Sequence, residues 1–202
     1  MLFLSEVLST VLQVVAFSLI PLVWWLCTAR KKEGFLSWVG LKKPAPEDWK
    51  KWAFAMAATY VVLFAVGQLA VLLRGELEVE SEYAGMGAAA LPCILVYSFG
   101  HTALSEEILF RGFLLKRLAA RFGFSWANLI QAAVFGLIHL VEVLLLMDIG
   151  FVAGFVIVVY PMLTAMLMSY VNEKMSGGSI LPSWLIHGCL NFLELLLLAF
   201  QI

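Results

Sequence analysis

The chain has 202 residues, of which 63% are hydrophobic and 13% are charged, and its 13 lysines and arginines nearly balance its 14 aspartates and glutamates. A soluble globular domain has about 45–50% apolar and about 25% charged residues, so that class is excluded. The lysines and arginines form no basic stripe of the kind that nucleic-acid-binding proteins carry, so no nucleic-acid partner is expected. The composition predicts an all-α, polytopic membrane protein, because a helix satisfies its own backbone hydrogen bonds in lipid.

Six apolar stretches approach the length of about 20 residues that crosses a bilayer. They cover about residues 3–27, 52–73, 86–115, 125–146, 149–171 and 180–202. The first carries Glu6 and is longer than the roughly 7–15 apolar residues of a cleavable signal peptide, so we interpret it as a retained helix. We expect one membrane domain over residues 1–202, folded as a bundle of about six spanning helices.

The loops between these stretches alternate in charge. Lysines and arginines gather in residues 28–51, in residues 116–121 and at Lys174, whereas the second and fourth stretches are followed by acidic residues, Glu76, Glu78, Glu80, Glu82 and Asp148. Basic loops stay on the cytoplasmic side, so both termini are predicted on the non-cytoplasmic side of the cell membrane. Residues 28–51 are predicted to form a basic, interfacial segment on the cytoplasmic leaflet. An ordinary connecting loop is the alternative.

Ionisable side chains inside the predicted spans are few. Each costs about 2.5–3.5 kcal/mol at the membrane centre and usually faces the bundle interior, where it serves function. With the neutral Asn191, they are His101, Glu106, Glu107, Arg111, His139, Glu142, His187 and Glu194. At 1.5 Å per residue, Glu106, His139 and His187 lie about 10–20 Å from the cytoplasmic ends of three helices. We therefore expect a polar active-site cavity that opens toward the cytoplasmic half of the bundle.

Two glutamates in the third stretch are expected to differ in role. Glu107 and Arg111 are four residues apart, so they share a helix face and are predicted to form an ion pair. Glu106 lies about 100° round the helix from Glu107 and has no cation near it in sequence. A carboxylate in that position suits a general base. The alternative is that both glutamates are interfacial and solvated.

The fourth and sixth stretches each carry a histidine beside a same-face neighbour. His139 lies one turn after Phe135, and taken alone it is better interpreted as a structural interior histidine than as a catalyst. His187 and Asn191 share one helix face. Such a pair binds a metal, polarises a carbonyl or hydrogen-bonds across the bundle. Glu106, His139 and His187 also form the donor set of an open zinc site, so zinc stays an alternative.

The ordered set of these residues resembles the three motifs of the CPBP family, the CAAX protease and bacteriocin-processing (Abi) family. The resemblance covers about residues 97–202. The matching motifs are Glu106-Glu107-x-x-x-Arg111, Phe135-x-x-x-His139 and His187-x-x-x-Asn191.

This resemblance implies an intramembrane endopeptidase that hydrolyses a peptide bond near the C-terminus of a membrane-associated protein or peptide. It implies that Glu106 and His139 activate water and that His187 and Asn191 form the oxyanion hole, with Glu107, Arg111 and Phe135 in supporting positions. A glutamic mechanism without a cofactor is favoured, and a zinc metalloprotease is the alternative. A prenylated CAAX protein, a C-terminal sorting tail and a bacteriocin-type peptide stay open as substrates.

Two other classes of protein are compatible with the same helix bundle. A non-enzymatic immunity or partner-binding protein does not need Glu106, and a proton-coupled transporter uses ionisable groups in the membrane as a relay. Other intramembrane proteases fit poorly, because the sequence has no H-E-x-x-H motif.

Overall fold

The computed structural model describes residues 2–74 and 82–201, which form helices and connections without a strand among them. Within these residues six helices are long and apolar enough to cross a membrane, which confirms the predicted all-α bundle. The helices outside the third span are α1 (Leu2–Thr28), α3 (Trp49–Arg74), α6 (Phe124–Leu144), α7 (Phe151–Tyr170) with its π-helical extension η4 (Val171–Met175), and α8 (Leu181–Phe200).

The third span has the least regular backbone. It runs through η1 (Gly87–Ala90), α4 (Leu91–Val96), η2 (Tyr97–Leu104), η3 (Glu107–Leu115) and α5 (Lys116–Phe122). Both η2 and η3 are π-helical. Such wide turns are rare and occur frequently at functional sites. Glu106 and Glu107 stand where the second π-helical stretch begins, so the irregular backbone coincides with the predicted catalytic glutamate.

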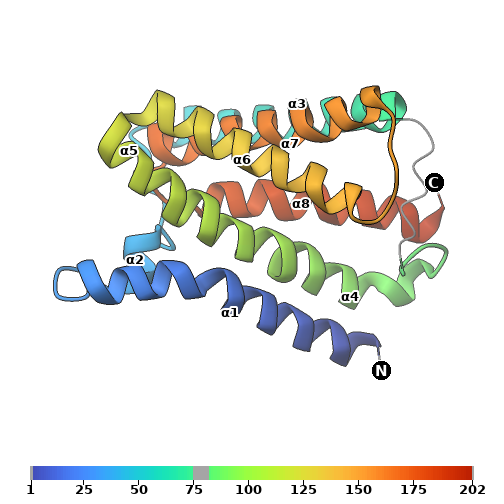
Figure 1. Cartoon of the computed structure of the whole chain (residues 1–202), viewed down its shortest axis with the longest axis horizontal. Coiled ribbons are helices and arrows are strands. Elements are labelled where there is room, and N and C mark those ends of the chain that lie inside the picture. The colour runs from blue at the N-terminus through green and yellow to red at the C-terminus, as the bar shows by residue number, and fades with distance from the viewer. Residues whose placement is uncertain (1, 75–81, 202) are drawn as a thin grey trace.

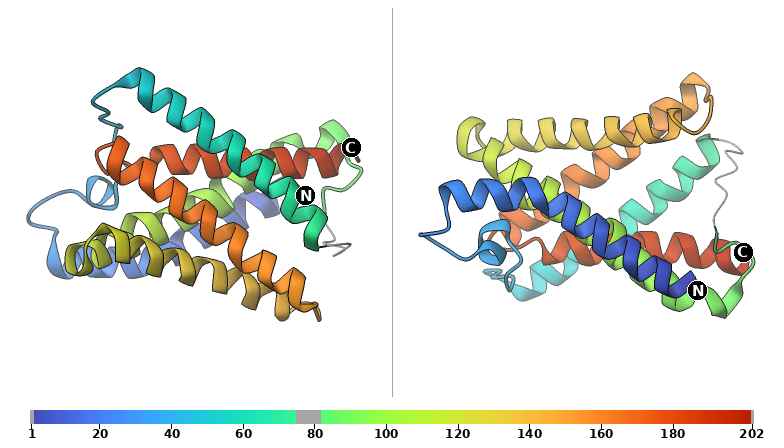
Figure 2. Two further views of the ribbon diagram at one scale, coloured as in Figure 1. Left: turned by 90° about the horizontal axis from the view of Figure 1, so that it is seen from above. Right: turned by 60° about the horizontal axis from the view of Figure 1, so that its bottom comes forward.

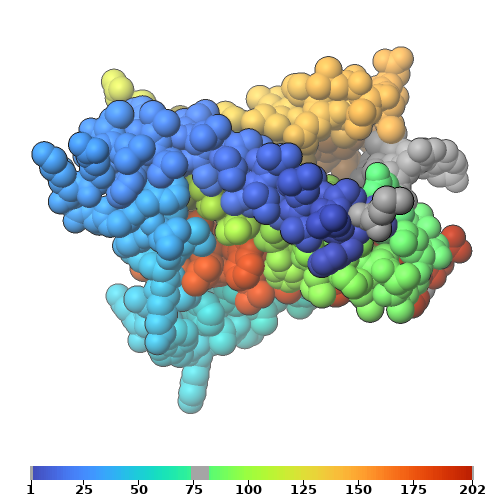
Figure 3. All heavy atoms as spheres, turned by 90° about the horizontal axis from the view of Figure 1, so that it is seen from below, coloured from blue at the N-terminus to red at the C-terminus, as the bar shows by residue number. Residues whose placement is uncertain are grey.

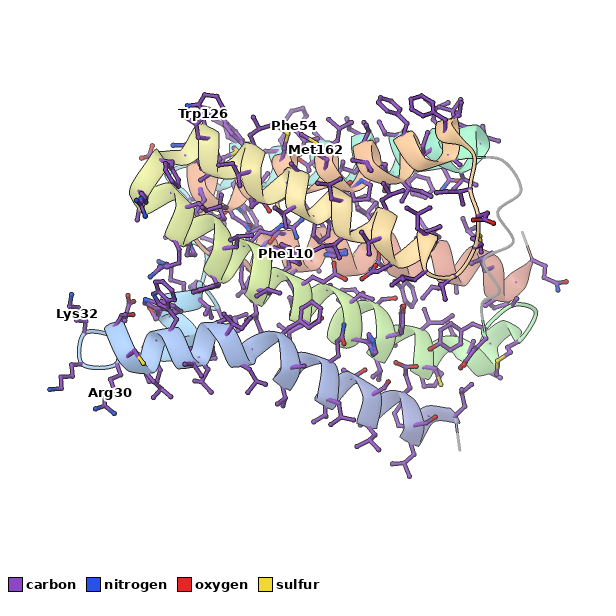
Figure 4. All side chains as sticks on the ribbon, in the orientation of Figure 1. Arg30, Lys32, Phe54, Phe110, Trp126 and Met162 are labelled. Carbon is purple, nitrogen blue, oxygen red and sulfur yellow. The ribbon has the colours of Figure 1, made fainter. Side chains whose placement is uncertain are left out.

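The spans are stacked around the third one. Figure 1 shows α1 on one side of it and α6 and α8 on the other, and the same packing is seen in the contacts of η2 and η3. Helix α1 covers one outer face of the molecule (Figure 3). On the opposite face α3 crosses α8 and packs on α7 (Figure 2). Large apolar side chains such as Phe54 and Trp126 point outward, as expected for helices that face lipid (Figure 4).

The bundle has two distinct ends. Both chain termini lie at one end, here called the terminal end, and α2 (Phe35–Val39) and α5 lie at the other (Figure 1). Arg30 and Lys32 extend from the latter, here called the basic end (Figure 4). The loops that carry Lys and Arg therefore lie at one end of the bundle, as the sequence pattern predicts. The predicted acidic residues Glu76, Glu78 and Glu80 lie outside the described residues.

The segment that the sequence predicts to be interfacial packs against the bundle. Trp38 and Val39 in α2 are 5% and 0% exposed, because they lie beneath the third span. Gly40 follows with a positive φ of 88°, a conformation that favours glycine, and it ends the short helix. The backbone N–H of Ile180 donates to the carbonyl of Gly40 at 2.9 Å. Residues 35–45, here called the α2 segment, are thus joined to the start of α8.

Glu6 in α1 is tolerated in a spanning helix because it is buried with partners. The Tyr83 hydroxyl donates to Glu6 Oε2 at 2.7 Å, and His101 Nδ1 lies 3.7 Å from Glu6 Oε1. The burial of Tyr83 and its hydrogen bond to Glu6 raise the pKa of the Tyr83 hydroxyl. This polar cluster attaches α1 to the third span and to the loop before it.

Candidate active site

The centre of the site is a buried ion pair on the third span. Arg111 Nη1 lies 3.3 Å from Glu107 Oε1, and both side chains are 0% exposed. The four-residue spacing predicts this pair, and the structure contains it. The Arg111 guanidinium also lies over the Phe135 ring, 4.3 Å from its centroid, an attractive cation–π geometry. Phe135 therefore contacts the pair from α6.

Glu107 receives two further donors from α8. His187 Nδ1 lies 3.2 Å from Glu107 Oε1, and the Ser183 hydroxyl donates to Glu107 Oε2. Ser183 is held in turn by Asn172 of η4, which donates to its hydroxyl at 2.6 Å and accepts from its backbone N–H at 3.1 Å. A buried carboxylate needs such donors, because an isolated buried charge is very costly. Glu107 thereby links η3, η4 and α8.

The two ring nitrogens of His187 face two different carboxylates. Nδ1 contacts Glu107, and Nε2 lies 3.7 Å from Glu106 Oε2. A neutral imidazole has one N–H, so a ring that donates from Nδ1 to Glu107 has an Nε2–H only when it is protonated. His187 can therefore offer a hydrogen bond from Nε2 as an imidazolium, and Glu107 fixes the direction of that bond.

His139 is held in the orientation of a base. Its Nδ1 lies 2.8 Å from the carbonyl oxygen of Phe135, which only accepts hydrogen bonds. Nδ1 thus carries the proton, and in the neutral ring Nε2 keeps its lone pair. The Phe135 ring lies against the imidazole with 4.5 Å between ring centroids. This tautomer suits proton abstraction by Nε2.

Asn191 is oriented by a threonine on the third span. Its Nδ2 donates to Thr102 Oγ1 at 2.8 Å, and Thr102 donates onward to the Ser98 carbonyl at 3.1 Å. An amide nitrogen carries two N–H groups, so Asn191 keeps one for another acceptor.

A cavity of about 620 Å³ lies among α3, α6, α7 and α8. His139, His187 and Asn191 line it together, along with Glu142, Glu194 and mainly apolar residues of α3 and α7. The structure does not show the polar cavity, open toward the cytoplasmic half of the bundle, that the sequence predicts. The lining comes from the half of the bundle nearer the terminal end.

The structure brings most of the predicted residues together, but Glu106 is not among the residues that line the cavity. Among the described residues no hydrogen bond or ion pair joins Glu106 to His139. Glu106 Oε2 is buried without a hydrogen-bond partner in this part of the chain. Glu142 interacts electrostatically with both Glu106 and His139. Glu142 thus lies near both Glu106 and His139, and these two are joined by no hydrogen bond or ion pair among the described residues.

The zinc alternative requires three ligands around one point. No group of three His, Cys, Asp or Glu side chains in residues 2–74 and 82–201 is arranged to hold a metal ion. His187 Nδ1 is directed at Glu107, and its Nε2 lies 3.7 Å from Glu106 Oε2, a separation that two ligands of one tetrahedral zinc ion can have.

Three residues of the site escaped the sequence analysis, namely Thr102, Ser183 and Asn172. Thr102 lies four residues before Glu106, and Ser183 lies four residues before His187, so both share a face with a predicted residue. That spacing could have identified both residues from the sequence. For Asn172 the only sequence signal is that it is a polar residue at the end of an apolar span.

The hydrogen bond from Ser183 predicts an effect on turnover. A hydrogen bond to a charged group contributes about 1.5–3 kcal/mol, so Ser183→Ala is expected to lower kcat by about tenfold or more. KM should change little, because Ser183 does not line the cavity. Ser169→Ala is the control, since Ser169 is equally buried but binds Gln131. Steady-state kinetics of the purified variants measure both constants, and a raised KM at unchanged kcat would contradict the positioning role.

One known protein family matches the part of the chain that carries the site. The family model described as type II CAAX prenyl endopeptidase, Rce1-like, matches residues 87–193, which is more than half of the chain and contains all three motifs. The match confirms the resemblance to the CAAX proteases. No curated protein and no solved structure gives a significant match.

Proposed function

Because the chain belongs to the Rce1-like family of type II CAAX prenyl endopeptidases, we propose that it hydrolyses a peptide bond near the C-terminus of a membrane-associated protein or peptide. The family indicates an intramembrane protease of the CAAX type. One observation carries the finer proposal: His139, His187 and Asn191 line one cavity, and Glu106 contacts His187.

Water activation is assigned to Glu106 and His139. Glu106 Oε2, which has no hydrogen-bond partner among the described residues, and the His139 Nε2 lone pair are both able to accept a proton from water. The hydroxide oxygen then bonds to the carbonyl carbon of the substrate, and the carbonyl electron pair moves onto its oxygen. When this intermediate collapses, the C–N bond breaks and the proton passes to the leaving nitrogen. The products are a carboxylate and an amine.

The oxyanion is assigned to His187 and Asn191. When protonated, His187 offers an Nε2–H donor on the same helix face of α8 as the second N–H of Asn191, and both residues line the cavity. Donors that are held in place before the reaction stabilise developing charge without reorganisation. Glu107 and Thr102 hold these two side chains through the contacts described above.

The proposed mechanism needs no metal, and this is testable. Chelator treatment of purified, active protein is expected to leave the cleavage rate unchanged, because Glu106 and His139 activate water by themselves. Metal analysis of the same sample should find zinc well below one ion per chain. Stoichiometric zinc that is lost together with activity in His187→Ala would overturn the glutamic mechanism in favour of a zinc enzyme.

The basic end is proposed to face the cytoplasm in the cell membrane, which places both termini on the non-cytoplasmic side. The support is the gathering of Lys and Arg at that end, following the positive-inside rule.

Membranes from cells that produce the wild type or Glu106→Gln test the proposed function directly. Mass spectrometry of C-terminal peptides should find new termini near the ends of membrane proteins in the wild type alone. Identical sets of termini in both would contradict the protease assignment.

A further inference from the structure

The basic end combines positive charge with exposed aromatic rings. Its lysines and arginines belong to residues 28–51, residues 116–121 and Lys174. Trp24, Phe122 and Trp126 are exposed in the helices next to these loops, and Figure 4 shows Trp126 on the outer surface at this end. Tryptophan rings gather where lipid headgroups lie, and clusters of lysine and arginine beside spanning helices attract anionic lipids. The chemistry of this end therefore fits the phosphate group of an anionic lipid.

Some lysines at this end already have partners within the protein. Lys116 Nζ lies 2.7 Å from Glu173 Oε1 and donates to the Gly178 carbonyl at 2.8 Å. Lys51 Nζ lies 3.8 Å from Asp48 Oδ2. A carboxylate next to an ammonium group offsets its charge, so these two lysines attract an external phosphate less strongly than a cation without an ion pair does.

Arg117 is held in a different way. Its guanidinium lies over the Trp38 ring, 4.3 Å from the centroid, an attractive cation–π geometry. Its Nε is buried and has no hydrogen-bond partner in the described part of the chain. Glu33, in the connection from α1 to α2, interacts with Arg117 electrostatically, but no ion pair joins the two among residues 2–74 and 82–201. A buried N–H without an acceptor is costly, so Arg117 is suited to a ligand that supplies acceptor oxygens.

The ring beneath Arg117 is fixed by other aromatic side chains. The Trp38 centroid lies 6.1 Å from that of Phe113 in the third span and 6.4 Å from that of Phe35 in α2. Trp24 of α1 in turn packs edge-on against Phe113 at 5.6 Å. Three elements of the fold therefore hold the Trp38 indole in place. A guanidinium stacked on a fixed ring loses less side-chain freedom when it binds a phosphate, because its plane is already oriented.

From this geometry we infer that Arg117, stacked on Trp38, binds the phosphate group of an anionic phospholipid at the membrane surface. Arg121 lies one turn further along α5, so the two guanidiniums share a helix face. A guanidinium donates to two oxygens of one phosphate at once. The phosphate belongs to a lipid, because α5 is the end of an apolar span and the exposed Phe122 follows Arg121 directly. Neither arginine lines the cavity, so this site is independent of the proposed catalysis.

Native mass spectrometry of the purified full chain in detergent tests this site with two defined lipids. Phosphatidylglycerol and phosphatidylcholine with identical acyl chains are added in equal amounts, and the retained copies of each are counted. The wild type is expected to retain phosphatidylglycerol about tenfold or more over phosphatidylcholine, the preference that one hydrogen bond to a charged group supplies. Arg117→Gln should retain the two lipids about equally. Soluble glycerol 3-phosphate, added at the lipid concentration, should displace neither.

Lys50→Gln is the control for overall charge, because it removes one positive charge from an exposed residue of the same end. It should keep the preference for phosphatidylglycerol. Arg117→Lys keeps the charge and loses the planar group, so it is expected to lose the preference as Arg117→Gln does. It also replaces Arg117→Gln in the test if size-exclusion profiles show that the glutamine variant does not fold.

Three results would overturn the site. Equal retention of both lipids by the wild type would remove the lipid preference. Equal losses in Lys50→Gln and in the Arg117 variants would reduce the preference to the overall charge of the basic end. Displacement of phosphatidylglycerol by glycerol 3-phosphate would assign the site to a soluble phosphate ester in place of a lipid.

Discussion

Purified Glu106→Gln is expected to lose cleavage activity by about 10²–10⁴-fold, the contribution of a positioned general base. The amide has nearly the shape of the carboxylate but cannot accept the proton of the attacking water. Folded yield should stay near that of the wild type, because Glu106 Oε2 has no hydrogen-bond partner to lose. Initial rates at saturating substrate, with size-exclusion profiles of both proteins, measure the two quantities.

The matched control is Glu6→Gln, which makes the same change in a buried glutamate of another span. It is expected to keep its turnover per folded molecule, because the partners of Glu6 are Tyr83 and His101, and neither of them lines the cavity. Activity of Glu106→Gln within a few fold of the wild type would remove Glu106 from water activation. A non-enzymatic partner-binding or immunity protein would likewise keep its phenotype in this variant.

Glu107→Ala is expected to lower the free energy of unfolding by about 3–5 kcal/mol, because it leaves the Arg111 guanidinium buried without its ion-pair partner. The same change removes the acceptor of Ser183 and His187. Folded yield and the midpoint of thermal unfolding in detergent should both fall. Glu106→Gln, one residue away, should change neither.

A double-mutant cycle separates the ion pair from the rest of this network. Arg111→Met alone should also be strongly destabilising, since it leaves the Glu107 carboxylate without its cation. The double variant Glu107→Ala with Arg111→Met should lose less stability than the sum of the two single changes, because no charge is left unpaired. Additive losses, or equal loss of yield in Glu106→Gln and Glu107→Ala, would contradict the division of roles between the two glutamates.

The sequence by itself determined the features that depend on local spacing and on solvent. Continuous apolar stretches specify six spans because lipid tolerates only helices with satisfied backbones, and loop charge placed the basic residues at one end. The Glu107–Arg111 pair followed from its four-residue spacing, since that interval puts both on one helix face. The three motifs identified the family for the same reason, each being one helical turn that carries its own chemistry.

Only the tertiary structure decided how these turns meet. Contacts between helices depend on their relative rotation and depth, which spacing within one helix does not encode. His187 therefore lies against both glutamates, whereas no hydrogen bond or ion pair joins Glu106 to His139 among the described residues, and Asn172 enters the site from η4 with no local signal. The position of the α2 segment was likewise decided by packing. It folds back under the third span because burial of Trp38 and Val39 removes apolar surface from water, and such a long-range contact is not encoded in the spacing of residues within one helix.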